Sequence, residues 1–380
     1  MSASIFEQSL AAAPAVVIPS ATRVVRLPDP LPMKLGGVLE AVDMAYESWG
    51  EPNGANTVLL FTGLSPSAHA ASSPEDPEPG WWEDMIGPGR ALDTGRFHVV
   101  CVNSLGSCFG SSGPASPDPA TGRVYGTDFP ELSLEDVALA ARRLLDVLGI
   151  EHLHTVMGAS MGGMSALAFA RANPERFDNL SLISTAAVPS AYAIALRSLQ
   201  REIVRSDPAW QKGAYPPGAG PRQGMCLARK LGMTTYRAAE EWEQRFGHKR
   251  IDALRRRAVP FAMEFEVESY LEHQAQKFCD QFDANCYLYL SRAVDRFDLC
   301  EDGCDVTELF AGAAPRHVQI IGVHTDTLFP PSQQAWLSEA FGRAGAQVDV
   351  RVLDCLQGHD AFLVDTEQFG RIIGEFFAAL

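Results

Sequence analysis

The chain has 380 residues, of which 46% are hydrophobic and 21% are charged, and its formal net charge is −16. This length is more than one simple core needs, so it favours a single large soluble domain that carries an insertion. The negative charge argues against nucleic acid or an anionic membrane as a partner, because both select a basic protein face.

The cysteines give no sign of a metal site. None of the eight lies in a C-x-x-C pair, and "CEDGC" (300–304) has no second half. We therefore expect no metal, and we expect reduced thiols in a cytoplasmic protein. The N-terminus lacks the positive start of a signal peptide, and no run of about 18 apolar residues occurs, so we expect neither secretion nor a membrane span.

The first half of the chain alternates between predicted strands and helices. After an irregular lead-in over residues 1–30, short apolar runs predict strands at 57–63, 97–106, 153–158 and 180–187. Helices are predicted at 133–149 and 164–174. Ser133 and Asp136 form a capping-box pattern at the start of the first, and Gly149 ends it. The segments 65–82 and 110–126 are rich in Pro, Ser and Gly and predict long loops.

The second half begins with a different pattern. Residues 188–300 give only helical periodicity, for example at 191–204 and 267–282, before strands return at 317–326 and 348–355 and a helix ends the chain at 366–380. Strands that alternate with helices predict a mostly parallel sheet with helices on both faces. We therefore divide the chain into an α/β core (1–187), a helical lid insertion (188–300) and the rest of the core (301–380).

The segment "MGASMGG" (157–163) lies between a predicted strand and a predicted helix. It contains G-x-S-x-G, the nucleophile elbow of the α/β-hydrolase fold, in which small neighbours allow a sharp turn that exposes the serine. Ser160 is therefore the predicted nucleophile. The backbone N–H groups of Met161 and of Leu64, in the loop after the first predicted strand, are the predicted donors of an oxyanion hole.

A serine nucleophile needs a histidine base held by an acid, and this fold presents them in the order Ser, acid, His. His359 is the histidine after Ser160 that lies in a loop between the last strand and the last helix, so it is the predicted base. Asp326, at the end of the strand predicted at 317–326, is the predicted acid. Asp360 is the competing acid, but it adjoins His359 in sequence and is poorly placed to reach the far ring nitrogen.

Several segments resemble a known family over nearly the whole chain. The segments are "VNSLGSCFGSSGP" (102–114), "VMGASMGGMSAL" (156–167), "ARKLGMTTYR" (228–237), "ESYLEHQAQKF" (268–278), "FDANCYLYLSRAVDRFD" (282–298), "HTDTLFPP" (324–331) and "GHDAFL" (358–363). The chain resembles the homoserine O-acyltransferases of the α/β-hydrolase fold and their relatives, the serine O-succinyltransferases.

The resemblance implies acyl transfer from an acyl-CoA co-substrate through an acyl-enzyme, with no bound cofactor, in a homodimer joined through the insertion. It further implies that Arg229 binds the amino-acid acceptor and that Asp360 binds its amino group. A guanidinium suits a carboxylate and a carboxylate suits an ammonium group, so the chemistry agrees with both roles.

The acceptor and the donor are harder to predict. Gly63, Leu64, Ser65 and Pro66 replace the "ALTG" typical of homoserine acetyltransferases, which favours L-serine. Arg197 stands where acetyl-CoA enzymes tend to have asparagine, which favours succinyl-CoA. Leu328 stands where homoserine succinyltransferases usually have arginine, which argues the other way. We expect succinyl transfer to L-serine for cysteine biosynthesis. A homoserine O-acetyl- or O-succinyltransferase of methionine biosynthesis is the alternative, followed by a plain esterase.

Overall fold

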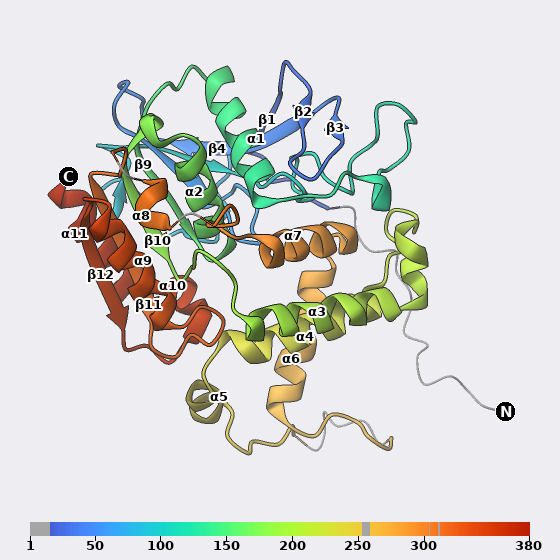
Figure 1. Ribbon diagram of the computed structural model, residues 1–380. Coiled ribbons are helices and arrows are strands. Elements are labelled where there is room, and N and C mark those ends of the chain that lie inside the picture. Colours follow the sequence, from blue (N-terminus) through green and yellow to red (C-terminus); the bar gives the residue numbers. More distant parts are fainter. Residues whose placement is uncertain (1–15, 253–258, 304, 311) are drawn as a thin grey trace.

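A computed structural model describes residues 16–252, 259–303, 305–310 and 312–380. Its central sheet has eight strands in the order β1-β4-β8-β5-β9-β10-β11-β12 (Figure 1). β4 runs antiparallel to β1 and β8, and the remaining pairs are parallel, which confirms the mostly parallel α/β fold. The strands are β1 (Arg23–Arg26), β4 (Asp43–Trp49), β5 (Thr57–Phe61), β8 (His98–Val102), β9 (Leu153–Ala159), β10 (Phe177–Ile183), β11 (His317–Val323) and β12 (Gln347–Leu353).

Helices cover both faces of this sheet, because alternate strand side chains point to opposite faces. On one face α1 (Leu134–Val147), α2 (Met161–Ala172) and α9 (Pro331–Arg343) share a buried cluster with residues such as Leu59 and Val156. On the other face α11 (Thr366–Ala379) packs against their neighbours, such as Leu60 and Met157. Within the described residues, no helix is long and apolar enough to cross a membrane.

The remaining elements are short strands and helices outside the central sheet and its covering helices. Two short ribbons pair β2 with β3 and β6 with β7. The short elements are β2 (Leu31–Pro32), β3 (Val38–Leu39), β6 (Ile86–Gly87), β7 (Leu92–Asp93), α8 (Val306–Leu309), α10 (Ala361–Val364) and the 3₁₀ helices η1 (Gly126–Asp128), η2 (Pro174–Arg176), η3 (Pro208–Gly213) and η4 (Gly358–Asp360).

The sequence located most elements but misplaced some ends. The capping box is confirmed, since the Ser133 hydroxyl accepts a hydrogen bond from Asp136 N–H (3.2 Å) and the Asp136 carboxylate accepts one from Ser133 N–H (2.8 Å). The lead-in over residues 1–30 is not wholly irregular, because β1 lies at its end and pairs with β4, which the apolar runs did not reveal. β11 ends at Val323, so Asp326 lies in the following loop rather than in the strand.

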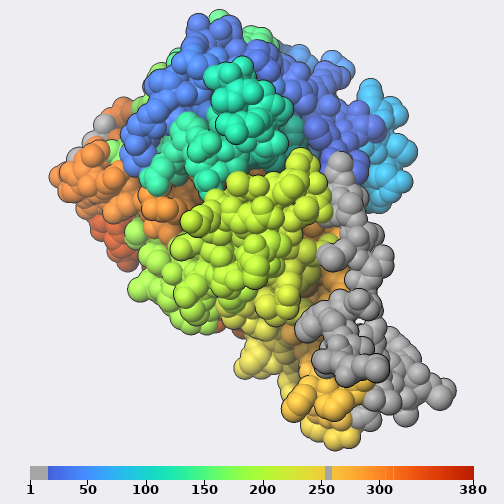
Figure 2. Space-filling model, turned by 90° about the vertical axis from the view of Figure 1, so that its right-hand side faces the viewer, coloured from blue at the N-terminus to red at the C-terminus, as the bar shows by residue number. Residues whose placement is uncertain are grey.

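Between β10 and β11, apart from η3 and the short α8, the described residues form five helices on one side of the core (Figure 1). They are α3 (Ala191–Ser206), α4 (Arg222–Tyr236), α5 (Ala239–Arg245), α6 (Glu266–Cys279) and α7 (Ala284–Arg296). α7 buries most of its residues, many of them in the core cluster, whereas α6 buries only Ala275. Figure 2 shows the yellow and orange part of this insertion projecting from the rest of the molecule.

Glycines allow the strand–turn–helix unit β9–Ser160–α2 to pack against the sheet. A Cβ atom on Gly162 would lie 2.3 Å from the carbonyl oxygen of Phe61 in β5, and one on Gly158 would lie 2.3 Å from the Gly162 carbonyl carbon. Real Cβ atoms do not approach backbone so closely, so any side chain at either position would push α2 off the sheet.

We predict that Gly162→Ala destabilises the protein by at least about 1–3 kcal/mol, measured by chemical denaturation, because overpacking outweighs the helix propensity of alanine. The matched control is Gly342→Ala in α9, where a Cβ atom would meet nothing within 4 Å. There the same change should stabilise by up to about 1 kcal/mol. Equal effects at the two positions would contradict the close approach of α2 to β5.

Candidate active site

Three side chains from distant parts of the chain form one hydrogen-bonded line. Ser160 Oγ lies 2.7 Å from His359 Nε2, and His359 Nδ1 lies 2.8 Å from Asp326 Oδ2. Ser160 lies between β9 and α2, Asp326 follows β11, and His359 lies in η4 after β12. The structure therefore brings together the serine, histidine and aspartate singled out in the sequence, in the geometry of a nucleophile, its base and an orienting acid.

The backbone of Ser160 is held in an unusual conformation. Its φ is 57° and its ψ is −123°, a region that side-chain-bearing residues rarely occupy. Its N–H donates to the Ile183 carbonyl (2.9 Å), and its carbonyl accepts from Gly163 N–H (3.0 Å) and the Thr185 hydroxyl (2.8 Å). These bonds to α2 and β10 hold the turn that lifts Oγ above the strand ends.

Asp326 fixes the histidine ring. Its side chain is fully buried, and its Oδ1 accepts hydrogen bonds from the N–H groups of Leu328 (2.9 Å) and Phe329 (3.0 Å). An ionised carboxylate only accepts, so His359 Nδ1 must donate to it, which leaves Nε2 free to accept the serine proton. Burial alone would lower the pKa of His359, but the charge and hydrogen bond of Asp326 outweigh it, so this pKa lies above its ordinary value.

A glycine lets the histidine loop approach the insertion. Gly358 has a φ of 58°, and a Cβ atom there would lie 2.5 Å from the Tyr236 carbonyl oxygen at the end of α4. Only glycine accepts both the left-handed backbone and this close contact. α4 and His359 therefore share one wall of the site.

Ser160 and His359 line a cavity of about 140 Å³. The residues predicted from sequence for the oxyanion hole, the acceptor and the donor all line it as well. They are Gly63, Leu64, Ser65, Pro66, Met161, Arg197, Arg229 and Asp360. Asp326 is not a lining residue, because it lies behind the histidine ring. The residues that the sequence singled out therefore lie together around one cavity, while their individual roles stay predictions.

The two arginines of this cavity each keep a buried N–H without a partner. In Arg229 the buried group is Nε, and its guanidinium lies over the rings of Phe278 (4.6 Å) and Tyr236 (5.5 Å). In Arg197 the buried group is Nη2, while Nε donates to Asp295 (2.5 Å). A buried guanidinium N–H without a partner is unfavourable, and a ligand that accepts a hydrogen bond from it would relieve this cost.

Asp360 faces the cavity beside a cation that sequence reasoning missed. Its Oδ2 lies 3.6 Å from Arg237 Nε, and Arg237 also binds Glu241 (2.6 Å). Burial raises the pKa of Asp360 despite the opposing charges of His359 and Arg237. Arg237 is the second arginine of the "ARKLGMTTYR" segment, so the motif itself contained the signal.

Three further lining residues were also missed. Trp81, from the loop predicted at 65–82, and Tyr236 and Tyr287, from the insertion, all contribute to the wall. Aromatic residues at single positions carry no periodic pattern, so nothing in the sequence distinguished them from core residues.

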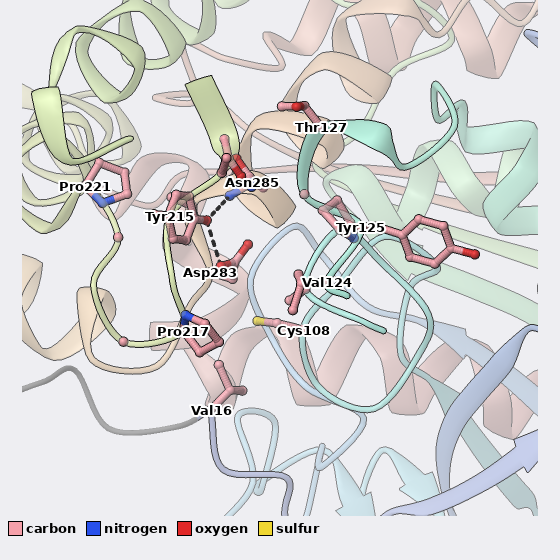
Figure 3. A pocket seen from close by; sticks show the side chains of 18 of the residues that line it. Val16, Cys108, Val124, Tyr125, Thr127, Tyr215, Pro217, Pro221, Asp283 and Asn285 are labelled. Atoms are coloured by element: carbon pink, nitrogen blue, oxygen red, sulfur yellow. Dashed lines mark hydrogen bonds between the residues drawn. The ribbon is translucent and has the colours of Figure 1, made fainter. Parts of the chain in front are cut away.

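A larger cavity of about 540 Å³ lies elsewhere, between the loop around Cys108 and Tyr125 and the insertion (Figure 3). Figure 3 shows Tyr215 between Asp283, which accepts from its hydroxyl (2.7 Å), and Asn285, whose N–H donates to it (2.9 Å). None of the triad residues lines this cavity. The described residues contain no group of three or more side chains that could hold a metal ion.

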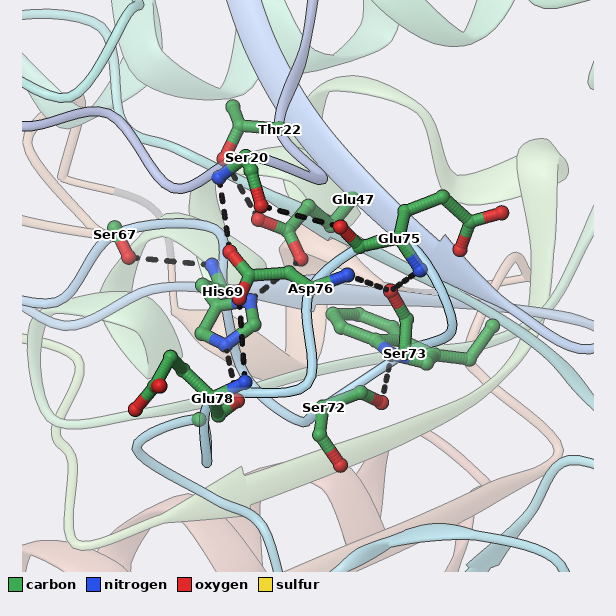
Figure 4. Close-up of polar contacts among 12 residues, drawn as sticks. Ser20, Thr22, Glu47, Ser67, His69, Ser72, Ser73, Glu75, Asp76 and Glu78 are labelled. Carbon is green, nitrogen blue, oxygen red and sulfur yellow. Dashed lines mark hydrogen bonds and ion pairs between the residues drawn. The ribbon is translucent and has the colours of Figure 1, made fainter.

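A buried ion pair holds the loop that carries Pro66 and Trp81. Figure 4 shows His69 between Glu47 of β4, whose carboxylate lies 2.9 Å from Nδ1, and the Glu78 carbonyl, 2.8 Å from Nε2. Both partners are acceptors, so both ring nitrogens must carry protons. Burial lowers the pKa of His69, but the hydrogen bonds to Glu47 and Glu78 raise this pKa by more, so it lies above its ordinary value.

We predict that His69→Gln destabilises the protein by at least about 1.5 kcal/mol below pH 6, because it leaves the buried Glu47 carboxylate without its ion pair. A raised pKa in the folded state contributes stability below the unfolded pKa of about 6.5, and this is lost as pH rises through the folded pKa. Urea unfolding of wild type and variant from pH 5 to 9 measures the difference, which should shrink with rising pH.

The control is His152→Gln, whose ion pair with Asp178 (3.2 Å) is partly exposed and should contribute little at any pH. A destabilisation by His69→Gln that stays constant across the pH range would contradict a charged His69.

Comparison with known proteins agrees with this architecture. A family model described as "alpha/beta hydrolase fold" matches residues 56–365. A serine O-succinyltransferase of Litchfieldella anticariensis is 54% identical over 368 residues, 95% of this chain and 99% of that protein. An L-serine/homoserine O-acetyltransferase of Streptomyces lavendulae is 52% identical over 95% of this chain and 98% of that protein.

Among solved structures, a homoserine O-acetyltransferase from Bacillus anthracis matches with a TM-score of 0.83 and 25% identity, over 93% of this chain and 97% of that one. Because the family model spans most of the chain and the relatives match it almost end to end, this chain belongs to the α/β-hydrolase fold family, in the group of O-acyltransferases that includes the serine O-succinyltransferases.

Proposed function

We propose that this enzyme transfers a succinyl group from succinyl-CoA to the hydroxyl of L-serine through an acyl-enzyme on Ser160. The observation that carries the proposal is the pairing of the triad with two arginines in one small cavity, each of which has one buried N–H group without a hydrogen-bond partner. A reaction between a dicarboxylic acyl group and an amino acid needs two carboxylate sites beside the nucleophile. Arg197 and Arg229 would supply them, and several closely similar relatives are named serine O-succinyltransferase.

The first half-reaction uses the Ser160–His359 hydrogen bond. His359 Nε2 takes the proton as Ser160 Oγ attacks the thioester carbonyl, and the buried Asp326 stabilises the imidazolium that forms. The N–H groups of Leu64 and Met161 donate hydrogen bonds to the oxyanion. His359 then gives its proton to the departing CoA sulfur, which leaves a succinyl ester on Ser160.

The second half-reaction needs serine in place of water. Arg229 binds the carboxylate of the serine substrate, and Asp360 binds its ammonium group. The positive charge of that ammonium group offsets the cost of burying the Asp360 carboxylate. His359 deprotonates the serine hydroxyl, which attacks the ester and restores Ser160. The insertion closes the cavity, so an ordered acceptor competes better with water, which would hydrolyse the intermediate. The product would supply cysteine biosynthesis, where sulfide displaces succinate.

Homoserine as the acceptor and acetyl-CoA as the donor must be tested as well, because one relative is named for acetyl transfer to both serine and homoserine. Leu328, which lines the cavity near His359, adds an apolar group that suits an acetyl as well as a succinyl methylene. One methylene of acceptor length discriminates by only about 1–3 kcal/mol.

The deciding experiment combines L-serine or L-homoserine with succinyl-CoA or acetyl-CoA and identifies the ester by mass spectrometry. We expect the highest kcat/KM for succinyl-CoA with L-serine, roughly 10–200-fold above homoserine. Ser160→Ala is the control and should lose at least about 10⁴-fold. Free succinate as the main product would instead indicate an esterase, and faster acetyl transfer would refute the proposed donor.

We predict that Arg229→Met and Asp360→Asn weaken the acceptor step alone. Methionine keeps the packing on Phe278 and Tyr236 but removes the charge, so kcat/KM for L-serine should fall roughly 10–100-fold, the contribution of one charged hydrogen bond. The burst of CoA released without serine should remain, measured by rapid quench. Loss of the burst in step with turnover would show that these residues support the triad instead.

A further inference from the structure

A buried cluster of three charges joins α3 to α7 next to the active-site cavity. Asp295 of α7 accepts a hydrogen bond from Arg197 Nε (2.5 Å) and makes an ion pair with Arg201 Nη1 (2.7 Å), both from α3. The three side chains are 8%, 11% and 16% exposed, respectively. Arg201 also donates to the Ser291 carbonyl and hydroxyl (3.2 Å each), so it is well bonded on α7.

The two arginines have different surroundings. Arg197 lines the cavity that contains Ser160, whereas Arg201, one turn further along the same face of α3, lines a separate groove with Trp210 and Tyr289. Arg201 Nη1 is bonded within the protein, while Arg197 keeps Nη2 buried and without a partner. Two guanidiniums share one carboxylate, so one positive charge is left uncompensated, and the group that lacks a partner belongs to the arginine beside the reacting serine.

We propose that Asp295 is a positioning residue for acyl donors that end in a carboxylate, and that it acts through Arg197. This inference rests on the proposed function and names the device that selects the donor class. Asp295 engages Nε, so the opposite end of the guanidinium is left for the donor's terminal carboxylate. Acetyl donors lack this group and gain nothing from the cluster.

The carboxylate of Asp295 is needed because the two arginines repel each other. Like charges at close range in a buried site are strongly unfavourable, and a shared carboxylate is what allows both to stay. Without it Arg197 would turn away from Arg201 toward solvent, and its guanidinium would no longer be fixed in the cavity. Asp295 is therefore expected to affect the donor step without touching the substrate.

The test compares kcat and KM for succinyl-CoA and acetyl-CoA in four proteins: wild type, Asp295→Asn, Arg197→Gln and the double variant. We expect Asp295→Asn to lower kcat/KM for succinyl-CoA by roughly 10–100-fold, mainly by raising KM. This is the effect expected when one hydrogen bond to a charged group is lost. Acetyl-CoA use should change less than about threefold. Because Asp295 acts through Arg197, the double variant should match Arg197→Gln alone.

Three results would overturn the positioning role: equal losses on both donors, additive losses in the double variant, or a succinyl preference that survives Asp295→Asn. Retained acetyl transfer verifies that each variant is folded. If Asp295→Asn does not yield folded protein, Asp295→Glu keeps the charge, moves it by one methylene, and should raise KM for succinyl-CoA selectively. Wild type that fails to transfer succinyl to serine would refute the proposed function itself, a separate outcome.

Discussion

The left-handed backbone of Ser160 is the constraint on which the rest of this site depends. A φ of 57° at a residue with a side chain is unfavourable, so the surrounding structure must enforce it. Hydrogen bonds from β10 and α2 do so, and glycines at positions 158 and 162 let α2 start against β5 without a collision. The hydroxyl then projects beyond the strand ends, where the loops after β11 and β12 bring Asp326 and His359 to it. Without this turn, the hydrogen bond from Ser160 to His359 would have no geometric basis.

A triad of this kind activates a hydroxyl but does not choose what accepts the acyl group. We propose that the choice lies in the charges that the insertion adds around the triad. The protein carries a net charge of −16, yet the small cavity at Ser160 is lined by two arginines with unsatisfied, buried N–H groups. Burial of such groups opposes folding unless binding compensates for it. Anionic substrates would provide that compensation under the proposed function, whereas neutral esters would not.

The insertion is not uniform, and its most buried helix sets the geometry. α7 packs into the core cluster and carries Asp295 and Tyr287, whereas α6 is mostly half-buried, with Ala275 as its one buried residue, and projects from the body (Figure 2). Arg197 belongs to the lid. Its hydrogen bond to Asp295 fixes it to α7, which packs into the core. The ion pair of His69 with Glu47 does the same for the loop that carries Pro66 and Trp81 (Figure 4). Buried charges thereby connect one wall of the cavity to α7 and the other to β4.

The sequence alone determined the fold class, the elbow and the triad candidates, because these depend on short-range patterns and on chain order. G-x-S-x-G between a strand and a helix favours a nucleophile elbow over an ordinary turn, and the chain order of acid and histidine leaves few choices. The resemblance to a known family supplied Arg197, Arg229 and Asp360. Tertiary structure alone decided that Asp295 and Arg237 hold charged residues of the site, that Trp81, Tyr236 and Tyr287 form its walls, and that β1 and β4 extend the sheet. These facts depend on contacts between segments far apart in the chain, and neither local spacing nor hydrophobic periodicity encodes which buried charge meets which partner.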